Sequence, residues 1–164
     1  LMEIKAFNYK ASPGFDIADF RMYEQEIAAK PWMLDVTYLI FGYEMSDNGD
    51  VTIKQVWTKK VWEIARAMKS GTNRTIWPLN LQIKQGVVHK IRPAKWYGKK
   101  SKKFPIYESL EDFLAAIEET VFQNQDTHGD FPSWRQRMKA SYKKFYGKDL
   151  DMPRWSDIQS KYVL

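Results

Sequence analysis

The chain begins with Leu1 and continues Met2-Glu3-Ile4-Lys5-Ala6-Phe7-Asn8. The pattern over residues 2–7 has a period of two and predicts a β-strand, with Met2, Ile4 and Ala6 on one face and Glu3, Lys5 and Phe7 on the other. A domain rarely begins inside a core strand. Two interpretations stay open: Leu1 precedes a true initiating Met2, or the chain is the C-terminal portion of a longer polypeptide.

Three further elements are predicted in the next 50 residues. Asp16 is expected to cap a helix over residues 16–29. Residues 34–45 are apolar on both faces and rich in β-branched and aromatic side chains, which is typical of a central strand. The turn residues 47–50, Asp-Asn-Gly-Asp, predict a hairpin whose returning strand covers residues 51–58.

The remaining sequence changes from strands to helices. In chain order, the predictions are a short helix at 60–70, hairpin strands at 79–84 and 87–92, a helix capped by Ser109 with Asp112, and a helix from Pro132 to Gly147. Together the elements predict one α+β domain over residues 1–164, strand-rich first and helical in its C-terminal region.

Composition narrows the classes of function. The chain has no cysteine, which excludes disulfides and thiol catalysis and fits a cytoplasmic protein. Two histidines are too few for a histidine-rich metal site, so carboxylates are expected to hold any bound metal. No apolar run is long enough for a membrane span. The formal charge of +6 and the isoelectric point near 9.3 point to a polyanionic partner.

Glu3 and Lys5 are the first candidates for chemistry. Two positions apart on a strand, their side chains leave the same face about 6.6 Å apart along the chain. A carboxylate and an ammonium placed in this way suit metal-assisted hydrolysis of a phosphodiester. Glu3 would help to hold Mg²⁺, and Lys5 would orient the attacking water or help to deprotonate it. The alternative is a solvated pair on an exposed strand face.

The second hairpin contains a similar pattern, Gln82-Ile83-Lys84, with an amide in place of the carboxylate. A neutral amide is a poor ligand for a hard cation, so this pair is not expected to be catalytic. Asn80, Gln82 and Lys84 instead present amides and an amine from one hairpin face, which favours contacts to DNA bases or phosphates. A solvated hairpin face is the alternative.

Residues 90–103, called the basic segment below, contain seven basic side chains and no acidic one: Lys90, Arg92, Lys95, Lys99, Lys100, Lys102 and Lys103. Within it, Trp96 and Tyr97 are expected either to stack on nucleic acid or to pack beneath the backbone. The charge predicts DNA contact, and a solvated run is the alternative. A second basic stretch falls on the last predicted helix, where a stripe of Trp134, Met138, Tyr142 and Phe145 predicts core packing.

The order of a strand with Glu3-Ile4-Lys5, a helix at 16–29 and an apolar strand at 34–45 resembles the second half of the PD-(D/E)XK nuclease core. More narrowly, the sequence resembles type II restriction endonucleases of the NgoBV or NlaIV kind, through residues 3–8, Ser12-Pro13, Phe15-Asp16 and residues 38–43. The resemblance implies a mixed sheet flanked by helices and Mg²⁺-dependent, site-specific cleavage of duplex DNA. It further implies a prokaryotic, cytoplasmic homodimer active in restriction-modification defence.

The other metal-binding acid of that superfamily belongs on the strand before Glu-x-Lys, where this chain has only Leu1 and Met2. The resemblance therefore implies a missing N-terminal segment or a companion chain that carries this acid. Asp16, Asp19 and Asp35 are conceivable substitutes. Helix capping is the alternative for Asp16 and Asp19, and a place at a strand entrance is the alternative for Asp35.

Two residues near the end of the first strand, Asn8 and Ser12, are candidates for phosphate contact, with a turn role as the alternative. Two other functions also stay open for the whole chain. One is a non-catalytic DNA- or RNA-binding domain in which Glu3 and Lys5 are ordinary surface residues. The other is a protein-interaction module that uses exposed aromatic side chains.

Overall fold

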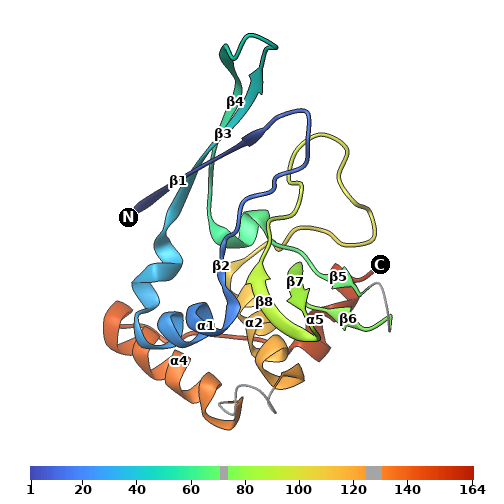
Figure 1. Cartoon of the computed structure of the whole chain (residues 1–164). Helices are drawn as coiled ribbons and strands as arrows, with labels where there is room; N and C mark the ends of the chain where they lie inside the picture. Colours follow the sequence, from blue (N-terminus) through green and yellow to red (C-terminus); the bar gives the residue numbers. More distant parts are fainter. Residues whose placement is uncertain (71–73, 125–130) are drawn as a thin grey trace.

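A computed structural model describes residues 1–70, 74–124 and 131–164, without the side chains of Phe131 and Pro132. Residues Met2–Asn8 form strand β1, as their alternation predicts, and β1 runs parallel to β3 (Thr37–Met45). Strand β4 (Val51–Lys59) returns antiparallel to β3 and gives the order β1-β3-β4 (Figure 1). Strand β3 is central, as predicted. In the sheet as described, β1 is an edge strand rather than the core strand that was expected.

The first helix, α1 (Phe20–Ala29), begins later than predicted. Its cap is Asp19, whose carboxylate accepts a hydrogen bond from the Met22 amide at 3.0 Å, so the prediction that Asp16 caps this helix is wrong. The physical reason is that Ala18–Asp19 (β2) is extended and pairs with β8. A short 3₁₀ turn, Pro31–Asp35, then leads into β3.

The predicted helix at 60–70 is also wrong. Only Val61–Ile64 form a 3₁₀ turn, and Met68–Lys69 (β5) pairs with Ile76–Trp77 (β6). The chain between them is extended because it pairs with a distant segment: the Tyr107 amide donates to the Ala65 carbonyl at 3.1 Å. The second hairpin is confirmed as β7 (Leu81–Lys84) and β8 (Val87–Ile91), in a sheet of order β2-β8-β7.

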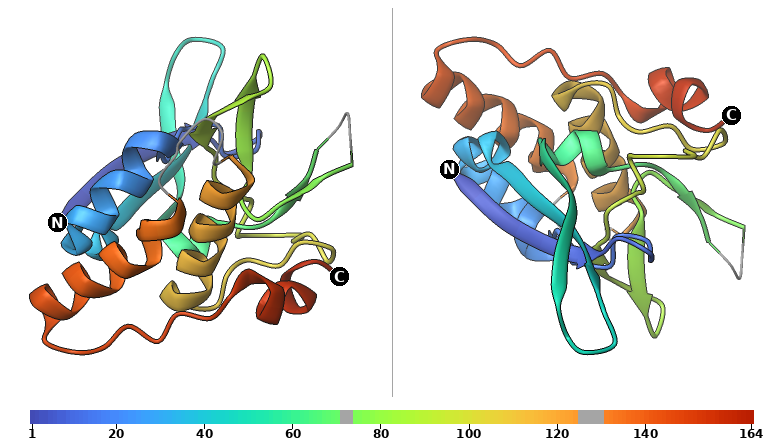
Figure 2. Two further views of the ribbon diagram at one scale, coloured as in Figure 1. Left: turned by 90° about the horizontal axis from the view of Figure 1, so that it is seen from below. Right: turned by 90° about the horizontal axis from the view of Figure 1, so that it is seen from above.

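Three helices in the described part of the chain complete the fold: α2 (Leu110–Gln123), α4 (Phe131–Tyr146) and α5 (Trp155–Tyr162). The Ser109 hydroxyl caps α2 as predicted. Helix α4 lies beside α1, and α2 contacts both α4 and α5 (Figure 2). Trp134 and Met138 of α4 are buried as predicted, but Phe145 is exposed. None of the described helices combines the length and the apolar character needed to cross a membrane.

A buried ion-pair network fastens the C-terminal helices together. The Arg135 guanidinium donates to both oxygens of Glu118, at 2.6 and 2.8 Å, and Arg154 donates to the same carboxylate at 3.1 Å. The Glu118 side chain is only 6% exposed. In the first turn of α2, the Tyr162 hydroxyl donates to the Asp112 carboxylate at 2.5 Å. Helix α5 is thus held to α2 by polar contacts as well as by packing.

The two faces of the β1-β3-β4 sheet differ. Phe7, Tyr38 and Ile40 are buried on the inner face, where Tyr38 lines a pocket together with Tyr23 of α1. On the outer face Met2, Ile4 and Val56 are 60%, 67% and 47% exposed. The helices described here therefore flank one face of this sheet.

Candidate active site and DNA interface

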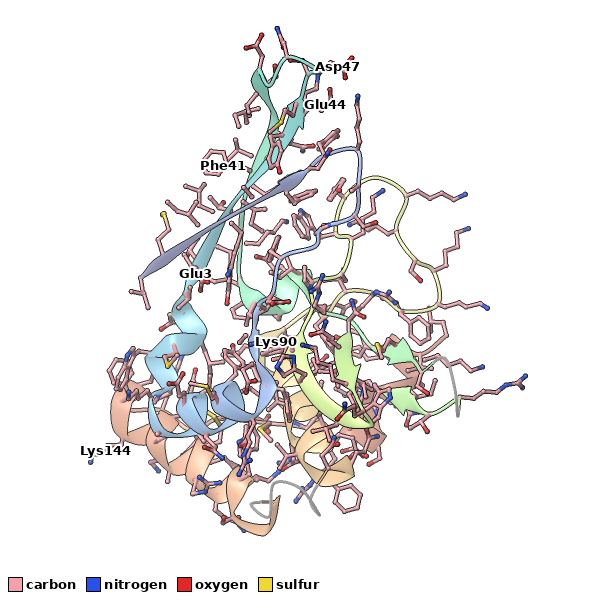
Figure 3. The ribbon with its side chains drawn as sticks, in the orientation of Figure 1. Glu3, Phe41, Glu44, Asp47, Lys90 and Lys144 are labelled. Carbon is pink, nitrogen blue, oxygen red and sulfur yellow. The ribbon has the colours of Figure 1, made fainter. Side chains whose placement is uncertain are left out.

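Glu3 and Lys5 lie together, as the period of two predicts. The Lys5 ammonium is 2.6 Å from a Glu3 carboxylate oxygen, and the two side chains are 20% and 44% exposed, respectively. In the parallel register Glu3 lies opposite Tyr38 and Lys5 opposite Ile40, both of which face the core. Figure 3 shows Glu3 near the beginning of β3, while Glu44 and Asp47 lie at the far end of the hairpin. The pair is therefore half-buried at the base of the sheet.

A pocket of about 280 Å³ separates Glu3 from helix α1. Its polar lining includes Asp19, Tyr23, Glu26 and Tyr38. Among the described residues the Tyr23 hydroxyl is buried without a hydrogen-bond partner. Burial raises the pKa of Tyr23 and Tyr38, and the nearby negative charge of Glu3 adds to the increase. Both phenols stay protonated, so Tyr23 presents an unused donor near the Glu3 carboxylate.

The acids considered as substitutes for the missing metal ligand have other roles. Asp16 accepts a hydrogen bond from Arg92 at 2.7 Å, Asp19 caps α1, and Asp35 accepts one from the Tyr146 hydroxyl. Within residues 1–70, 74–124 and 131–164 no three His, Cys, Asp or Glu side chains form a group that could hold a metal ion. Glu3 alone does not fit a complete divalent-metal site, because such ions need several oxygen ligands.

The hairpin candidates are only partly available for DNA. The Asn80 amide donates to the Pro93 carbonyl at 3.2 Å, and the Gln82 carbonyl oxygen lies 3.1 Å from His89. The register passes from Gln82 opposite Lys90 to Ile83 opposite Val88, so His89 forms a β-bulge. Lys84 is exposed at the turn. The hairpin therefore offers one free cation, and its two amides have partners within the described chain.

Asn8 and Ser12 lie in the turn after β1. The Asn8 side chain accepts from the Lys10 amide at 3.0 Å, and its backbone carbonyl accepts from Ala11 at 2.9 Å. Ser12 is exposed. The turn role that was the alternative for Asn8 is present, and the residue is exposed.

The basic segment divides into two parts. Its first two cations are neutralised within the fold: Lys90 lies 4.0 Å from Asp19, and Arg92 pairs with Asp16 and also donates to the Gly14 carbonyl. Its last five cations are exposed and form no ion pair within the described residues: Lys95, Lys99, Lys100, Lys102 and Lys103. The nitrogen-tipped side chains of this part extend away from the body of the molecule (Figure 3).

An aromatic cluster attaches the basic segment to β1. Its members are Phe7, Tyr9, Phe15, Trp57, Trp96 and Tyr97. The Phe7 ring centre lies 5.9 Å from that of Trp96 and 5.8 Å from that of Tyr97, and Trp57 lies 5.3 Å from Trp96. The two aromatic residues of the segment thus pack beneath it, which was one of the two predicted roles. The strand with Glu3 and Lys5 and the exposed lysines consequently share one rigid support.

Gly42 allows β3 to fit beneath these rings. A Cβ atom at this position would lie 2.8 Å from the Tyr9 ring and 3.1 Å from the Trp57 ring. The first distance is shorter than carbon atoms tolerate and the second is tight, so a side chain would force these rings to shift.

Two residues with functional character are not predicted by the sequence pattern. Tyr23 falls in a predicted helix, which gives no indication of its buried hydroxyl, and Arg66 falls in the predicted helix at 60–70, which does not form. A signal for Arg66 exists in Ile64-Ala65-Arg66-Ala67-Met68, where one cation interrupts a short apolar run.

A sequence profile of the family described as NgoBV restriction endonuclease matches residues 1–162. The chain is 56% identical over 162 residues to the type II restriction enzyme NlaIV of Neisseria lactamica, which covers 99% of this chain and 64% of that enzyme. It is 47% identical over 98 residues to the type II restriction enzyme NgoBV of Neisseria gonorrhoeae, covering 60% of this chain and 51% of that enzyme.

A solved structure, that of the NlaIV restriction endonuclease, has the same fold as this chain. The TM-score is 0.92 at 56% sequence identity, over 99% of this chain and 64% of that one. The chain therefore spans less than two thirds of the length of NlaIV. The resemblance inferred from residues 3–43 and the predicted α+β fold are confirmed. The chain belongs to the NgoBV restriction endonuclease family.

Proposed function

We propose that the protein containing this chain is a type II restriction endonuclease that cleaves duplex DNA at a specific site with Mg²⁺. The observation that carries the proposal is the half-buried Glu3–Lys5 pair. The aromatic cluster connects its strand, β1, to the basic segment with its exposed lysines. The names of the relatives agree with this activity. Action as a homodimer in the cytoplasm of a bacterium is part of the proposal.

Each residue of the pair has a separate role. Glu3 is the side chain of this chain that would contact the metal ion, which supplies charge stabilisation at the phosphate when bound. Lys5 keeps the Glu3 carboxylate oriented through their 2.6 Å contact and presents its ammonium to the attacked phosphate or to the water beside it. The second metal-binding acid is proposed to lie on a polypeptide segment outside this chain or on a companion chain. The residues described here form no group of three metal-ligating side chains.

The DNA contacts are proposed for the exposed lysines first. Lys95, Lys99, Lys100, Lys102 and Lys103 would neutralise backbone phosphates, with Lys84, Asn8 and Ser12 at the periphery. Lys90 and Arg92 bind acids within the fold, so their contribution to DNA binding requires exchange of those partners. Asn80 and Gln82 would likewise have to exchange partners before they read bases.

The test is single-turnover cleavage of duplex DNA with excess enzyme and Mg²⁺, on the protein at the full length that its gene encodes. Lys5→Ala should lower the cleavage rate by orders of magnitude while DNA binding is retained. Glu3→Ala should abolish cleavage and also weaken the metal dependence of specific binding. Lys84→Ala is the matched control and should change affinity more than the cleavage rate. A near-normal rate for Lys5→Ala contradicts the catalytic assignment.

A second candidate function is a DNA-binding domain without catalytic activity of its own. The observation in its favour is that the residues described here include no group of three metal-ligating side chains. Salt-sensitive binding of duplex DNA without any Mg²⁺-dependent cleavage would select this function over the first.

A further inference from the structure

A second pocket lies beneath the basic segment, away from Glu3. Its volume is about 610 Å³, which is in the usual range for ligand sites. Its lining contains four cations, and none of the described lining residues is acidic. The cations are Arg66, Lys95, Lys99 and Lys100. Three of the four cations come from the exposed part of the basic segment. The fourth, Arg66, comes from the extended chain before β5 and belongs to none of the groups assigned above.

Arg66 is held in place from two sides. Its backbone forms a β-bridge with Ile106, and the neighbouring Ala65 carbonyl accepts a hydrogen bond from the Tyr107 amide. The guanidinium carbon lies 5.7 Å from the centre of the Phe104 ring, which is within the range of a cation–π contact. The orientation of this guanidinium is therefore fixed before any ligand arrives.

The charge of Arg66 is not neutralised by the described part of the chain. Within residues 1–70, 74–124 and 131–164 its guanidinium donates one hydrogen bond, to the Ala67 carbonyl at 3.3 Å. No carboxylate of these residues lies within 4.0 Å of it. Burial lowers the pKa of Arg66 from its usual value. By contrast, the Arg135 side chain, which is 16% exposed, has Glu118 as a partner. A partly desolvated guanidinium with unused donors is stabilised when an anion binds to it.

The chemistry of the lining selects the anion. A guanidinium has a planar fork of donors that matches two oxygens of a phosphate, and the three lysines of the lining add positive charge. The Ser101 hydroxyl supplies a further donor. We propose that this pocket binds a phosphodiester of the DNA backbone, with Arg66 as its anchor. The inference rests on the proposed function, since duplex DNA is the source of the phosphodiester.

This contact would fix the position of the duplex relative to the cleavage site. Lys95 lies over the Tyr97 ring, with its ammonium 5.1 Å from the ring centre, and Tyr97 packs on Phe7 of β1. The pocket and the Glu3–Lys5 pair are thus joined by a short chain of packed rings. Arg66 is a positioning residue in this arrangement, because it contacts the substrate backbone and not the reacting atoms.

The experiment measures binding of a fluorescent duplex of arbitrary sequence by anisotropy, without divalent metal, at several salt concentrations. The variants are Arg66→Ala and Arg66→Lys, and Lys139→Ala on the exposed face of α4 is the control that removes the same charge. Arg66→Ala should weaken binding by about tenfold or more and lower the salt slope by about one, beyond the effect of the control. Arg66→Lys should restore the salt slope but only part of the affinity, because lysine lacks the fork.

The outcomes separate this inference from the proposed function. If the unmodified protein does not bind duplex DNA, the proposed function fails, and this inference fails with it. If it binds and Arg66→Ala behaves as Lys139→Ala does, only this inference is overturned. Displacement of DNA by inorganic phosphate is compared with that by chloride at equal ionic strength. If Arg66→Ala abolishes the binding of free phosphate but leaves the DNA affinity unchanged, the pocket binds a small anion and not the DNA backbone.

Thermal melting of each variant accompanies these measurements. If Arg66→Ala does not fold, the comparison of Arg66→Lys with the unmodified protein decides, because lysine keeps the charge and most of the packing on Phe104. Equal affinity for these two proteins at every salt concentration would overturn the role of the guanidinium fork.

Discussion

Replacing Lys99, Lys100, Lys102 and Lys103 together by alanine removes four exposed cations from the basic segment. None of them forms an ion pair within the described residues, so their charges are available to DNA phosphates. The aromatic cluster holds the segment in place through Trp96 and Tyr97, which the substitutions leave intact. We therefore expect the variant to fold normally and to lose affinity for all duplex sequences.

The magnitude follows from counterion release. If each lysine neutralises one phosphate, the slope of log affinity against log salt becomes shallower by about 3.6, at about 0.9 per contact. A fourfold rise in salt, from about 50 to 200 mM, would then lower the DNA affinity of the unmodified protein by a factor about 150 times larger than the factor for the variant. Anisotropy titrations of one labelled duplex over this range give both the affinity and the slope.

The matched control removes the same net charge from helix α4 and the short segment after it. Its four substitutions are at Lys139, Lys143, Lys144 and Lys148. Figure 3 shows Lys144 at the end of the molecule opposite the basic segment's outward side chains. If overall charge alone attracts DNA, the two quadruple variants will have the same slope. That result, or an unchanged slope for the basic-segment variant, would refute the reasoning.

Three other predictions concern the stability of the fold. Glu118→Gln should lower the free energy of unfolding by about 3–5 kcal/mol, measured in urea, because Arg135 is left buried without its anion. Gly42→Ala should cost about 1–3 kcal/mol in the same assay, since the added Cβ collides with the aromatic cluster. Burial and the hydrogen bond to Asp112 raise the pKa of Tyr162 to about 12. The unfolded chain loses this proton near pH 10, so stability should fall between about pH 10 and 12, and Tyr162→Phe should make the fall smaller.

Each of these predictions has its own control. Glu108→Gln removes an acid that is 74% exposed and lies 3.6 Å from Lys161, so it should change stability by well under 1 kcal/mol. Equal effects of the Glu108 and Glu118 substitutions would contradict the role of burial. For Gly42→Ala, unchanged urea unfolding would show that the rings move aside freely. For Tyr162, an identical fall with pH in the phenylalanine variant would assign the alkaline transition to other groups.

Local patterns predicted the strands and caps that depend on neighbours in sequence. The alternation at residues 2–7 located β1 and placed Glu3 beside Lys5, and Ser109 capped α2 as expected. The failures arose where a distant partner decided the structure. Aspartate is a residue type that commonly caps helices, but the Asp16 carboxylate instead accepts a hydrogen bond from Arg92, 76 positions away.

The same cause explains the missed helix and the missed pocket. Residues 60–70 contain good helix formers, yet their backbone pairs with the segment around Ile106 and Tyr107, which lies about 40 positions later. A helix would have turned Arg66 to another face. Its position under Lys95 and Lys100 follows only from this long-range pairing. The two roles of Trp96 and Tyr97 were equally open in the sequence, because whether a ring stacks on a ligand or on the protein depends on the tertiary contacts.

The geometry of Trp57 and Trp96 has an optical consequence. Their rings are 5.3 Å apart with an interplanar angle of 88°, and Tyr97 lies 4.9 Å from Trp57. Aromatic chromophores held rigidly in asymmetric surroundings give a near-ultraviolet circular dichroism signal that disappears when side-chain packing is lost. One of these indoles belongs to β4 and the other to the basic segment, so the spectrum of this pair reports whether the segment is docked on the sheet. Near-ultraviolet circular dichroism can therefore follow the contact between the basic segment and the sheet during titration with DNA or salt, without an attached label.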